Sequence, residues 1–149
     1  MDNAELRTRV GAAHLLASYQ YFADSGRLGP LVDLFLPDAV FRINDDTNVG
    51  RDAIEAYFRS AGESFRGVDI LPGRHHLSSI YVDPHAEGGA ATYACFQYIG
   101  IRGLDHWGTY RDEVVEVDGT WRFARRRVTV EGFAANSPLA PVALRGPGA

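Results

Sequence analysis

Two adjacent histidines, His75 and His76, stand in a segment, residues 73–83, whose β-branched and aromatic content predicts a β-strand. Side chains alternate across a strand, so the two rings point to opposite faces. We expect His75 to share its face with Leu77, Ser79 and Tyr81. Because histidine changes its charge close to neutral pH, one ring in a cavity would suit proton transfer. The alternative is that both rings are solvated or hydrogen-bonded at the end of a strand.

A carboxylate that could pair with a histidine ends the first predicted helix, residues 4–23. Apolar residues at intervals of three and four predict one buried stripe along it: Leu6, Val10, Ala13, Ala17 and Tyr21. At 3.6 residues per turn the stripe reaches Asp24, which we therefore expect on the core-facing side. Leu15 and Phe22 lie opposite the stripe, which predicts a second layer over the helix. A buried carboxylate needs a partner, although Asp24 could instead be a polar stop signal before Ser25.

The bulk properties narrow the class of protein. A chain of 149 residues, 46% hydrophobic and 23% charged, is long enough for one globular domain with a core. The net charge of −4, and the splitting of the basic run 125–127 between two faces, argue against nucleic-acid binding. A single cysteine excludes an internal disulfide. We expect no membrane interaction and a cytoplasmic protein, since neither a signal-like segment nor a long apolar run occurs.

The remaining pattern predicts an α+β fold. Further helices are expected at residues 26–36 and from about residue 50, and further strands at residues 39–43, 89–101, 106–117 and 121–133. Residues 44–48 are polar and predict a turn, and Asp118-Gly119 predicts a tight hairpin. The apolar face of the last strand switches between Phe123 and Ala124, which indicates a bulge. We expect one domain over residues 1–135 and a Pro- and Gly-rich tail over residues 136–149.

Several local motifs, taken in this order, resemble the SnoaL-like branch of the superfamily of nuclear transport factor two and ketosteroid isomerase. They are Tyr21-Phe22-Ala23-Asp24, residues 31–35, Pro37-Asp38-Ala39, residues 50–54, residues 74–78, residues 108–112 and residues 118–123 with Arg127-Val128. The resemblance covers about residues 6–133. It implies a cone-shaped, strongly curved antiparallel sheet, with three helices from the N-terminal half enclosing a pocket.

Within that superfamily the chain is most similar to scytalone dehydratase and hexachlorocyclohexane dehydrochlorinase. The resemblance implies a lyase without a cofactor, built on an Asp–His dyad, and Asp24 and His75 fall at the dyad's two positions. A further histidine of scytalone dehydratase corresponds to His106, or to Trp107 if the alignment slips by one residue. His75 would then be the base, and Asp24 would hold its tautomer and stabilise the imidazolium.

The chemistry also needs a donor for a developing oxyanion or a departing oxygen. The candidates are His106, Tyr19, Tyr21, Tyr93 and Tyr110, each of which could instead be a core side chain. The predicted substrate-binding residues are Tyr19, Tyr21, Phe41, Tyr93, Trp107, Tyr110 and Phe133. Their aromatic character favours a planar or apolar substrate.

The sequence therefore predicts a cofactor-independent dehydratase, cyclase or isomerase that acts on a small cyclic carbonyl compound of polyketide type. No metal is expected, although Asp24, His75 and His106 could form a facial metal triad. The alternative class is a non-catalytic ligand-binding or assembly subunit, as in ring-hydroxylating dioxygenases. Epoxide hydrolysis as in limonene epoxide hydrolase is a third class, but its Asp–Arg–Asp set is not found. The fold implies a homodimer or homotrimer, through the outer sheet face or the tail.

Overall fold

The computed structural model describes residues 1–140 of the chain, which form three helices and six strands. In order these are α1 (Asn3–Asp24), α2 (Leu28–Asp33), β1 (Phe35–Ile43), β2 (Asp46–Val49), α3 (Arg51–Ser64), β3 (Arg74–Pro84), β4 (Ala90–Gly100), β5 (Gly103–Val117) and β6 (Thr120–Phe133). The prediction of an α+β fold with three helices in the N-terminal half is confirmed.

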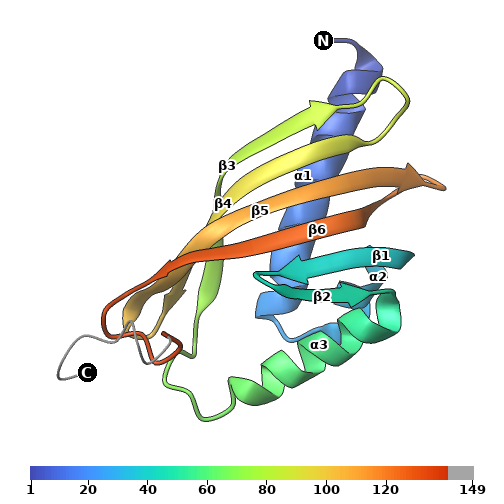
Figure 1. The fold of residues 1–149 in the computed structure, drawn as a ribbon. Helices are drawn as coiled ribbons and strands as arrows, with labels where there is room; N and C mark the ends of the chain where they lie inside the picture. The colour runs from blue at the N-terminus through green and yellow to red at the C-terminus, as the bar shows by residue number, and fades with distance from the viewer. Residues whose placement is uncertain (141–149) are drawn as a thin grey trace.

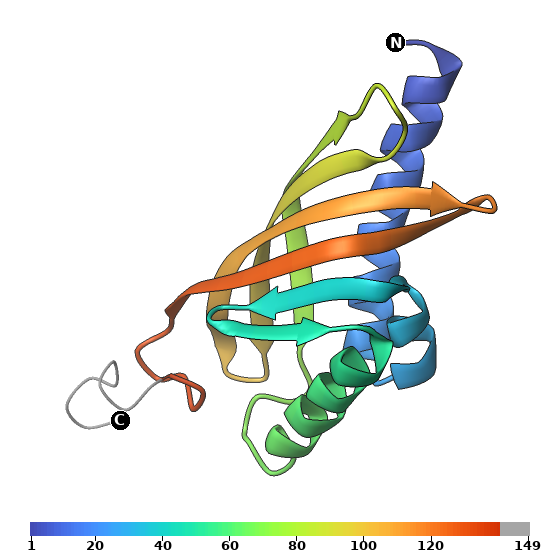
Figure 2. The ribbon, with the colours of Figure 1, turned by 45° about the vertical axis from the view of Figure 1, so that its right-hand side comes forward.

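All six strands form one sheet in the order β2-β1-β6-β5-β4-β3. The sheet curls around α1, which lies along its concave face, and α3 covers the end where β1 and β2 lie (Figure 1). The view in Figure 2 shows the same curl, which does not close into a barrel. Every neighbouring pair is antiparallel except β1 and β6, which run parallel. The sheet departs from the expected antiparallel pairing only where β1 joins β6, because an N-terminal strand lies beside the last of the described strands.

The segment around β1 differs from the sequence-based expectation. The second helix ends at Asp33 rather than near residue 36, and β1 begins at Phe35 rather than residue 39. Phe35 is fully buried and pairs with Phe123 of β6, so packing against the sheet overrides helical spacing. The predicted polar turn contains β2, a short edge strand that is almost wholly exposed. An edge strand without a buried face lacks the apolar alternation by which strands are recognised.

The buried side of α1 is not the stripe that the sequence analysis selected. Leu6, Val10 and Tyr21 are 49%, 62% and 61% exposed. The buried residues are instead Ala12, Leu15, Leu16, Tyr19 and Gln20. Apolar residues occur on both sides of this helix, so periodicity alone selects the wrong one. Asp24 nevertheless lies on the buried side, because it follows Leu16 and Gln20 at intervals of four.

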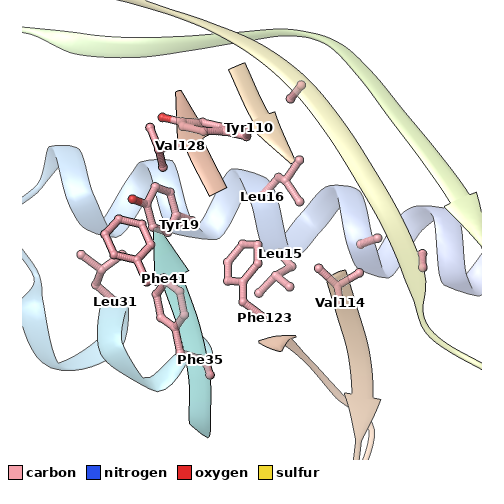
Figure 3. Packing of buried hydrophobic residues seen from close by; sticks show 14 of the residues in the cluster. Leu15, Leu16, Tyr19, Leu31, Phe35, Phe41, Tyr110, Val114, Phe123 and Val128 are labelled. Carbon is pink, nitrogen blue, oxygen red and sulfur yellow. The ribbon is translucent and has the colours of Figure 1, made fainter. Parts of the chain in front are cut away.

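The main core lies between α1 and the concave face of the sheet. Figure 3 shows Leu15, Leu16 and Tyr19 of α1 directed toward Phe123 and Tyr110 of the sheet. The Tyr19 ring makes edge contacts with Phe35, Phe58, Tyr110 and Phe123 at centroid distances of 5.8–6.2 Å. Burial of such large side chains contributes about 1.5–3 kcal/mol each. This packing fixes α1 against the sheet and thereby fixes the position of its last turn.

Irregular residues reset the faces of two strands. In β3 the pairing with β4 shifts between Ser78 and Tyr81, and Ser79 has a positive φ of 52°. The predicted alternation fails beyond this point, so Val82 is buried and Tyr81 is 60% exposed. In β6 the predicted bulge at Ala124 is confirmed by the register shift beside it. The predicted hairpin turn is also confirmed, since Asp118 and Gly119 both have positive φ.

The chain after β6 is described only as far as residue 140. Ser137 and Ala140 are buried, and the Ser137 hydroxyl accepts a hydrogen bond from the Leu139 amide at 3.1 Å. The rest of the predicted tail, residues 141–149, lies outside the described residues. Within residues 1–140, none of the helices has both the length and the apolar character needed to cross a membrane.

Candidate active site

A cavity of about 510 Å³ lies where α1 ends, between the concave face of the sheet, α3 and the segment that leads to β3. Its wall includes the carboxylate of Asp24 and the imidazoles of His75 and His106. Most other lining side chains are apolar or aromatic, including Phe22, Phe41, Tyr57, Phe58, Phe65, Phe96, Tyr98 and Tyr110. An apolar cavity of this size with a few convergent polar groups is typical of a small-molecule site.

Asp24 and His75 meet across this wall. The ring atom Nδ1 of His75 lies 2.7 Å from Asp24 Oδ1, and the backbone amide of His75 donates to Asp24 Oδ2 at 3.0 Å. Because both carboxylate oxygens are occupied by one residue, Asp24 fixes the position of the strand as well as the ring. A carboxylate only accepts, so Nδ1 carries the proton and Nε2 is the ring atom available for chemistry. The two side chains are 10% and 24% exposed, Asp24 being the more buried.

A second carboxylate–histidine pair lies beside the first. Nδ1 of His106 lies 2.8 Å from Asp105 Oδ2, and both residues are buried. Adjacent residues of a regular strand point to opposite faces. Here the pairing of β5 with β4 shifts, so that Tyr98 opposes His106 while Ile99 opposes Leu104. The extra residue is Asp105, which the sequence analysis missed because strand alternation places it on the outer face.

Tyr98 and Phe96 of β4 hold the two imidazoles in place. The Tyr98 ring stacks on His106 at 5.1 Å and meets His75 edge-on at 4.9 Å. The centroids of His75 and His106 are 6.0 Å apart. Tyr98 fits only because residue 73 is glycine: a Cβ there would overlap the Tyr98 hydroxyl oxygen. Tyr98 shares its strand face with Phe96, and this parity is the signal by which the sequence could have identified it.

Burial sets the protonation of several groups in the wall. It lowers the pKa of His106, with a further contribution from His75, while the hydrogen bond to Asp105 opposes this shift. Burial raises the pKa of Tyr19 to about 12 and that of Tyr110 well above its usual value. The two phenols therefore keep their protons at neutral pH and remain hydrogen-bond donors.

The structure brings together only part of the predicted substrate-binding set. Tyr19, Phe41 and Tyr110 line the cavity with the predicted catalytic residues Asp24, His75 and His106. Phe133 is absent from the lining and instead packs on the His106 ring at 5.9 Å.

The structure does not bring Tyr21, Tyr93 and Trp107 to this cavity. Tyr21 is 61% exposed on α1, on the side away from the sheet. Tyr93 lines a separate groove over the outer face of the sheet, where the Arg111 guanidinium stacks on its ring at 5.0 Å. Trp107 is 36% exposed and packs against Gly132 of β6. In each case the residue type was suitable, but the face was unknown before the buried side of α1 and the parity of the strands were fixed.

The alternative of a metal centre is not supported by the grouping of side chains. Within residues 1–140, no three His, Cys, Asp or Glu side chains are arranged so that they could hold a metal ion. Both carboxylate oxygens of Asp24 are already bonded to His75, one to its ring and one to its backbone amide. Asp24, His75 and His106 therefore do not form the facial triad considered above.

Several solved structures have the same fold as this protein. A candidate scytalone dehydratase from Novosphingobium aromaticivorans is 25% identical, with a TM-score of 0.77. The match covers 90% of this chain and 91% of that chain. Aln2 from a Streptomyces species is 25% identical, with a TM-score of 0.72, and the match covers 87% of this chain and 94% of that chain. LinA is 17% identical, with a TM-score of 0.73 over 93% of this chain and 97% of its own, which shows the fold alone.

The search of curated proteins gave no match. The family model of the SnoaL-like domain matches residues 4–127, which include α1 from its second residue on, the strand of His75 and all of β5. The chain therefore belongs to the SnoaL-like domain family.

Proposed function

We propose that the protein is a cofactor-independent lyase or isomerase of the dehydratase type, which acts on a small cyclic carbonyl compound. The observation that carries the proposal is the 2.7 Å contact between Asp24 Oδ1 and His75 Nδ1 in the wall of a largely apolar cavity. A subunit that only assembles with others has no need of a carboxylate held by both the amide and the ring of one histidine.

The proposed reaction begins at Nε2 of His75, which takes a proton from the carbon next to the substrate carbonyl. The electrons of the broken C–H bond form a C=C bond as the hydroxyl on the neighbouring carbon departs. The imidazolium returns the proton to this hydroxyl, which leaves as water. Asp24 keeps the imidazole in one tautomer and stabilises the imidazolium, so no oxidant, reductant or metal enters the balance.

Charge that develops on the carbonyl oxygen needs a donor, and the cavity offers two phenols. Tyr19 and Tyr110 line the wall together, with their ring centroids 6.1 Å apart. Because burial raises the pKa of both, each hydroxyl is protonated at neutral pH and can donate. The surrounding aromatic rings favour a planar, apolar substrate over a sugar or a charged metabolite.

The relatives support this class of reaction. The candidate scytalone dehydratase, similar over most of both chains, bears the name of an elimination enzyme. The fold itself hosts many functions, so the dyad and the cavity support the proposal more specifically than the fold does.

The test is a screen of cyclic β-hydroxyketones, in which formation of a conjugated enone is followed by its ultraviolet absorbance. With a substrate found, His75→Ala is expected to lower kcat by about 100- to 10,000-fold, and Asp24→Asn to lower it by at least about 100-fold. His76→Ala is the matched control, because His76 is the neighbouring histidine and is exposed. It should retain wild-type activity.

Equal loss in His75→Ala and His76→Ala, or no loss in either, would contradict the dyad. Tight binding of the ketones without turnover in the wild type would favour the ligand-binding alternative. Titration calorimetry with the same ketones measures binding independently of turnover, and so distinguishes an enzyme from a ligand-binding protein.

A further inference from the structure

Two carboxylate–histidine pairs contribute their imidazoles to the cavity wall, and they have the same internal geometry although they arise differently. Asp24 and His75 come from α1 and β3, whereas Asp105 and His106 are consecutive residues of β5. In each pair a carboxylate oxygen lies 2.7–2.8 Å from Nδ1. The first pair carries the proposed function, and the second has no assigned role.

The local backbone shows that the second pair is a specific feature of β5. Asp105 is the extra residue in the pairing of β5 with β4. The bulge turns its side chain to the same side of the sheet as that of its neighbour His106. The carbonyl of Asp105 accepts a hydrogen bond from the Ala134 amide at 2.7 Å, which fixes the bulge from the β6 side. The Asp105 side chain is 7% exposed, so its hydrogen bond to His106 is shielded from water. A buried carboxylate without such a partner would be costly.

The pair fixes the tautomer of His106. Because the carboxylate can only accept, the proton of the neutral imidazole lies on Nδ1, and Nε2 carries a lone pair. Tyr98, which stacks on this ring, directs its hydroxyl to the Ile70 carbonyl at 3.5 Å and not to the imidazole. His106 Nε2 has no hydrogen-bond partner among residues 1–140.

We propose that Asp105 is a positioning residue, which holds His106 with its proton on Nδ1 so that Nε2 accepts a hydrogen bond from a hydroxyl group of the substrate. The inference rests on the proposed function for its choice of substrate class. That class is a cyclic carbonyl compound with a second hydroxyl, besides the leaving one, about one ring's width from the carbon that His75 deprotonates. The two imidazole centroids lie 6.0 Å apart, which is close enough for one substrate ring to contact both.

The surroundings of His106 agree with an acceptor that stays neutral. The titratable groups in contact with it are His75 of β3 and Tyr98 of β4, whose ring centroids lie 6.0 Å and 5.1 Å from its own, and Asp105 of β5. Burial lowers the pKa of His106, and His75 lowers it further. Donation to the carbonyl oxygen thus falls to the phenols of Tyr19 and Tyr110, whose protons are retained.

The first test needs no substrate. In protein labelled with nitrogen-15 histidine, a two-bond proton–nitrogen correlation spectrum at pH 7 tells the Nδ1–H tautomer from the Nε2–H tautomer and from imidazolium. His106→Gln identifies the His106 signals by their loss. We expect His106 as the Nδ1–H tautomer in the wild type and a shift toward Nε2–H in Asp105→Leu, which is nearly isosteric but cannot accept. The matched control is Asp24→Leu, which should alter the His75 signals and leave His106 as the Nδ1–H tautomer.

A wild-type His106 that is doubly protonated or Nε2–H at pH 7 would overturn the proposal. So would an Asp105→Leu spectrum in which His106 is unchanged. Should Asp105→Leu fold poorly, the wild-type spectrum still decides the tautomer. Asp105→Asn then gives the comparison, because an amide can donate as well as accept and should weaken the preference for Nδ1–H.

The second test uses a substrate from the ketone screen together with its analogue lacking the second hydroxyl. The wild type is expected to prefer the hydroxylated compound by at least about 100-fold in kcat/KM, because the analogue leaves Nε2 unpaired. In His106→Leu the preference should fall below about tenfold. An undiminished preference in His106→Leu would overturn the role of Nε2. Failure of every ketone to react would refute the proposed function, and the spectra would still decide the tautomer.

Discussion

Asp112 and Arg126 form an ion pair in the core, whereas Asp24 and His75 form a hydrogen-bonded carboxylate–imidazole pair in the cavity wall. The first pair is fully buried, with Arg126 Nη1 donating to Asp112 Oδ2 at 3.1 Å and the Thr92 hydroxyl donating to the same oxygen at 3.0 Å. The second is 10–24% exposed toward the cavity. Both are acid–base pairs, but only the second can reach a substrate.

The surroundings explain the difference between these two pairs. The Arg126 guanidinium lies 3.9 Å from the Tyr19 ring centroid and 4.0 Å from that of Tyr110, so aromatic faces enclose the cation. Burial raises the pKa of Asp112 to about 6, which leaves the carboxylate ionised at neutral pH. A pair closed off in this way contributes to the structure, whereas a pair with one ring nitrogen facing a cavity can move a proton. The two pairs therefore differ in whether the basic side chain keeps an atom that a substrate can reach. The Arg126 guanidinium is enclosed by aromatic rings, whereas Nε2 of His75 is available at the cavity.

The largest effect on stability is expected when the core pair is broken. Arg126→Met leaves Asp112 buried without its cation and should lower the free energy of unfolding by about 3–5 kcal/mol. Urea denaturation at pH 7 measures the loss. The double variant Arg126→Met with Asp112→Leu removes both charges and should recover most of the stability. A single variant that costs less than about 1 kcal/mol would show that the pair is not structural.

A smaller effect on stability is expected at the cavity pair. Asp24→Leu removes two hydrogen bonds from His75, but water in the cavity can replace them, so the loss should be about 1 kcal/mol. The same variant should abolish most of the activity in the ketone assay. Asp24→Asn, which keeps the side chain's shape, controls for packing. A loss of stability as large as that of Arg126→Met would place Asp24 with the structural pair and weaken the comparison.

The smallest effect is expected from the protonation of His106. Its pKa is lower in the folded protein than the usual 6.5, so between these two values the unfolded chain binds more protons. Stability should therefore fall as the pH drops below about 6.5 and level off below the folded pKa. Urea denaturation at pH 7.5 and at pH 5.5, in the wild type and in His106→Leu, isolates this contribution. An equal pH dependence in both proteins would contradict a buried, neutral His106.

The sequence indicated the Asp24–His75 pair more reliably than it indicated the aromatic residues that line the cavity. Helix and strand periodicity each allowed Asp24 and His75 to face the core, but their pairing was implied by the resemblance to the SnoaL-like family, and the structure places them 2.7 Å apart. The prediction for Asp24 nevertheless used the wrong stripe of α1, since apolar residues on both sides of the helix make its buried face ambiguous. Only contact with the sheet resolves that ambiguity.

Features produced by irregular backbone could not be predicted in the same way. The bulge that turns Asp105 inward, and the one at Ser79 that turns Tyr81 outward, leave no mark in the apolar pattern. The bulge at Ala124 was predicted because Phe123 precedes it and the apolar face visibly switches. The edge strand β2 was missed because both of its faces are polar and exposed. Such features depend on contacts between distant segments, which local propensity does not encode.

The parallel pairing of β1 with β6 bears on how the protein is made. During translation β1 leaves the ribosome early, but the strand beside which it lies is synthesised last among the described elements. The nascent chain must keep the inner edge of β1, and then that of β5, uncovered until residues 120–133 emerge. Uncovered strand edges pair with other chains, so a message truncated within β5 should yield aggregated protein, and a chaperone that shields β1 would act before the cavity exists.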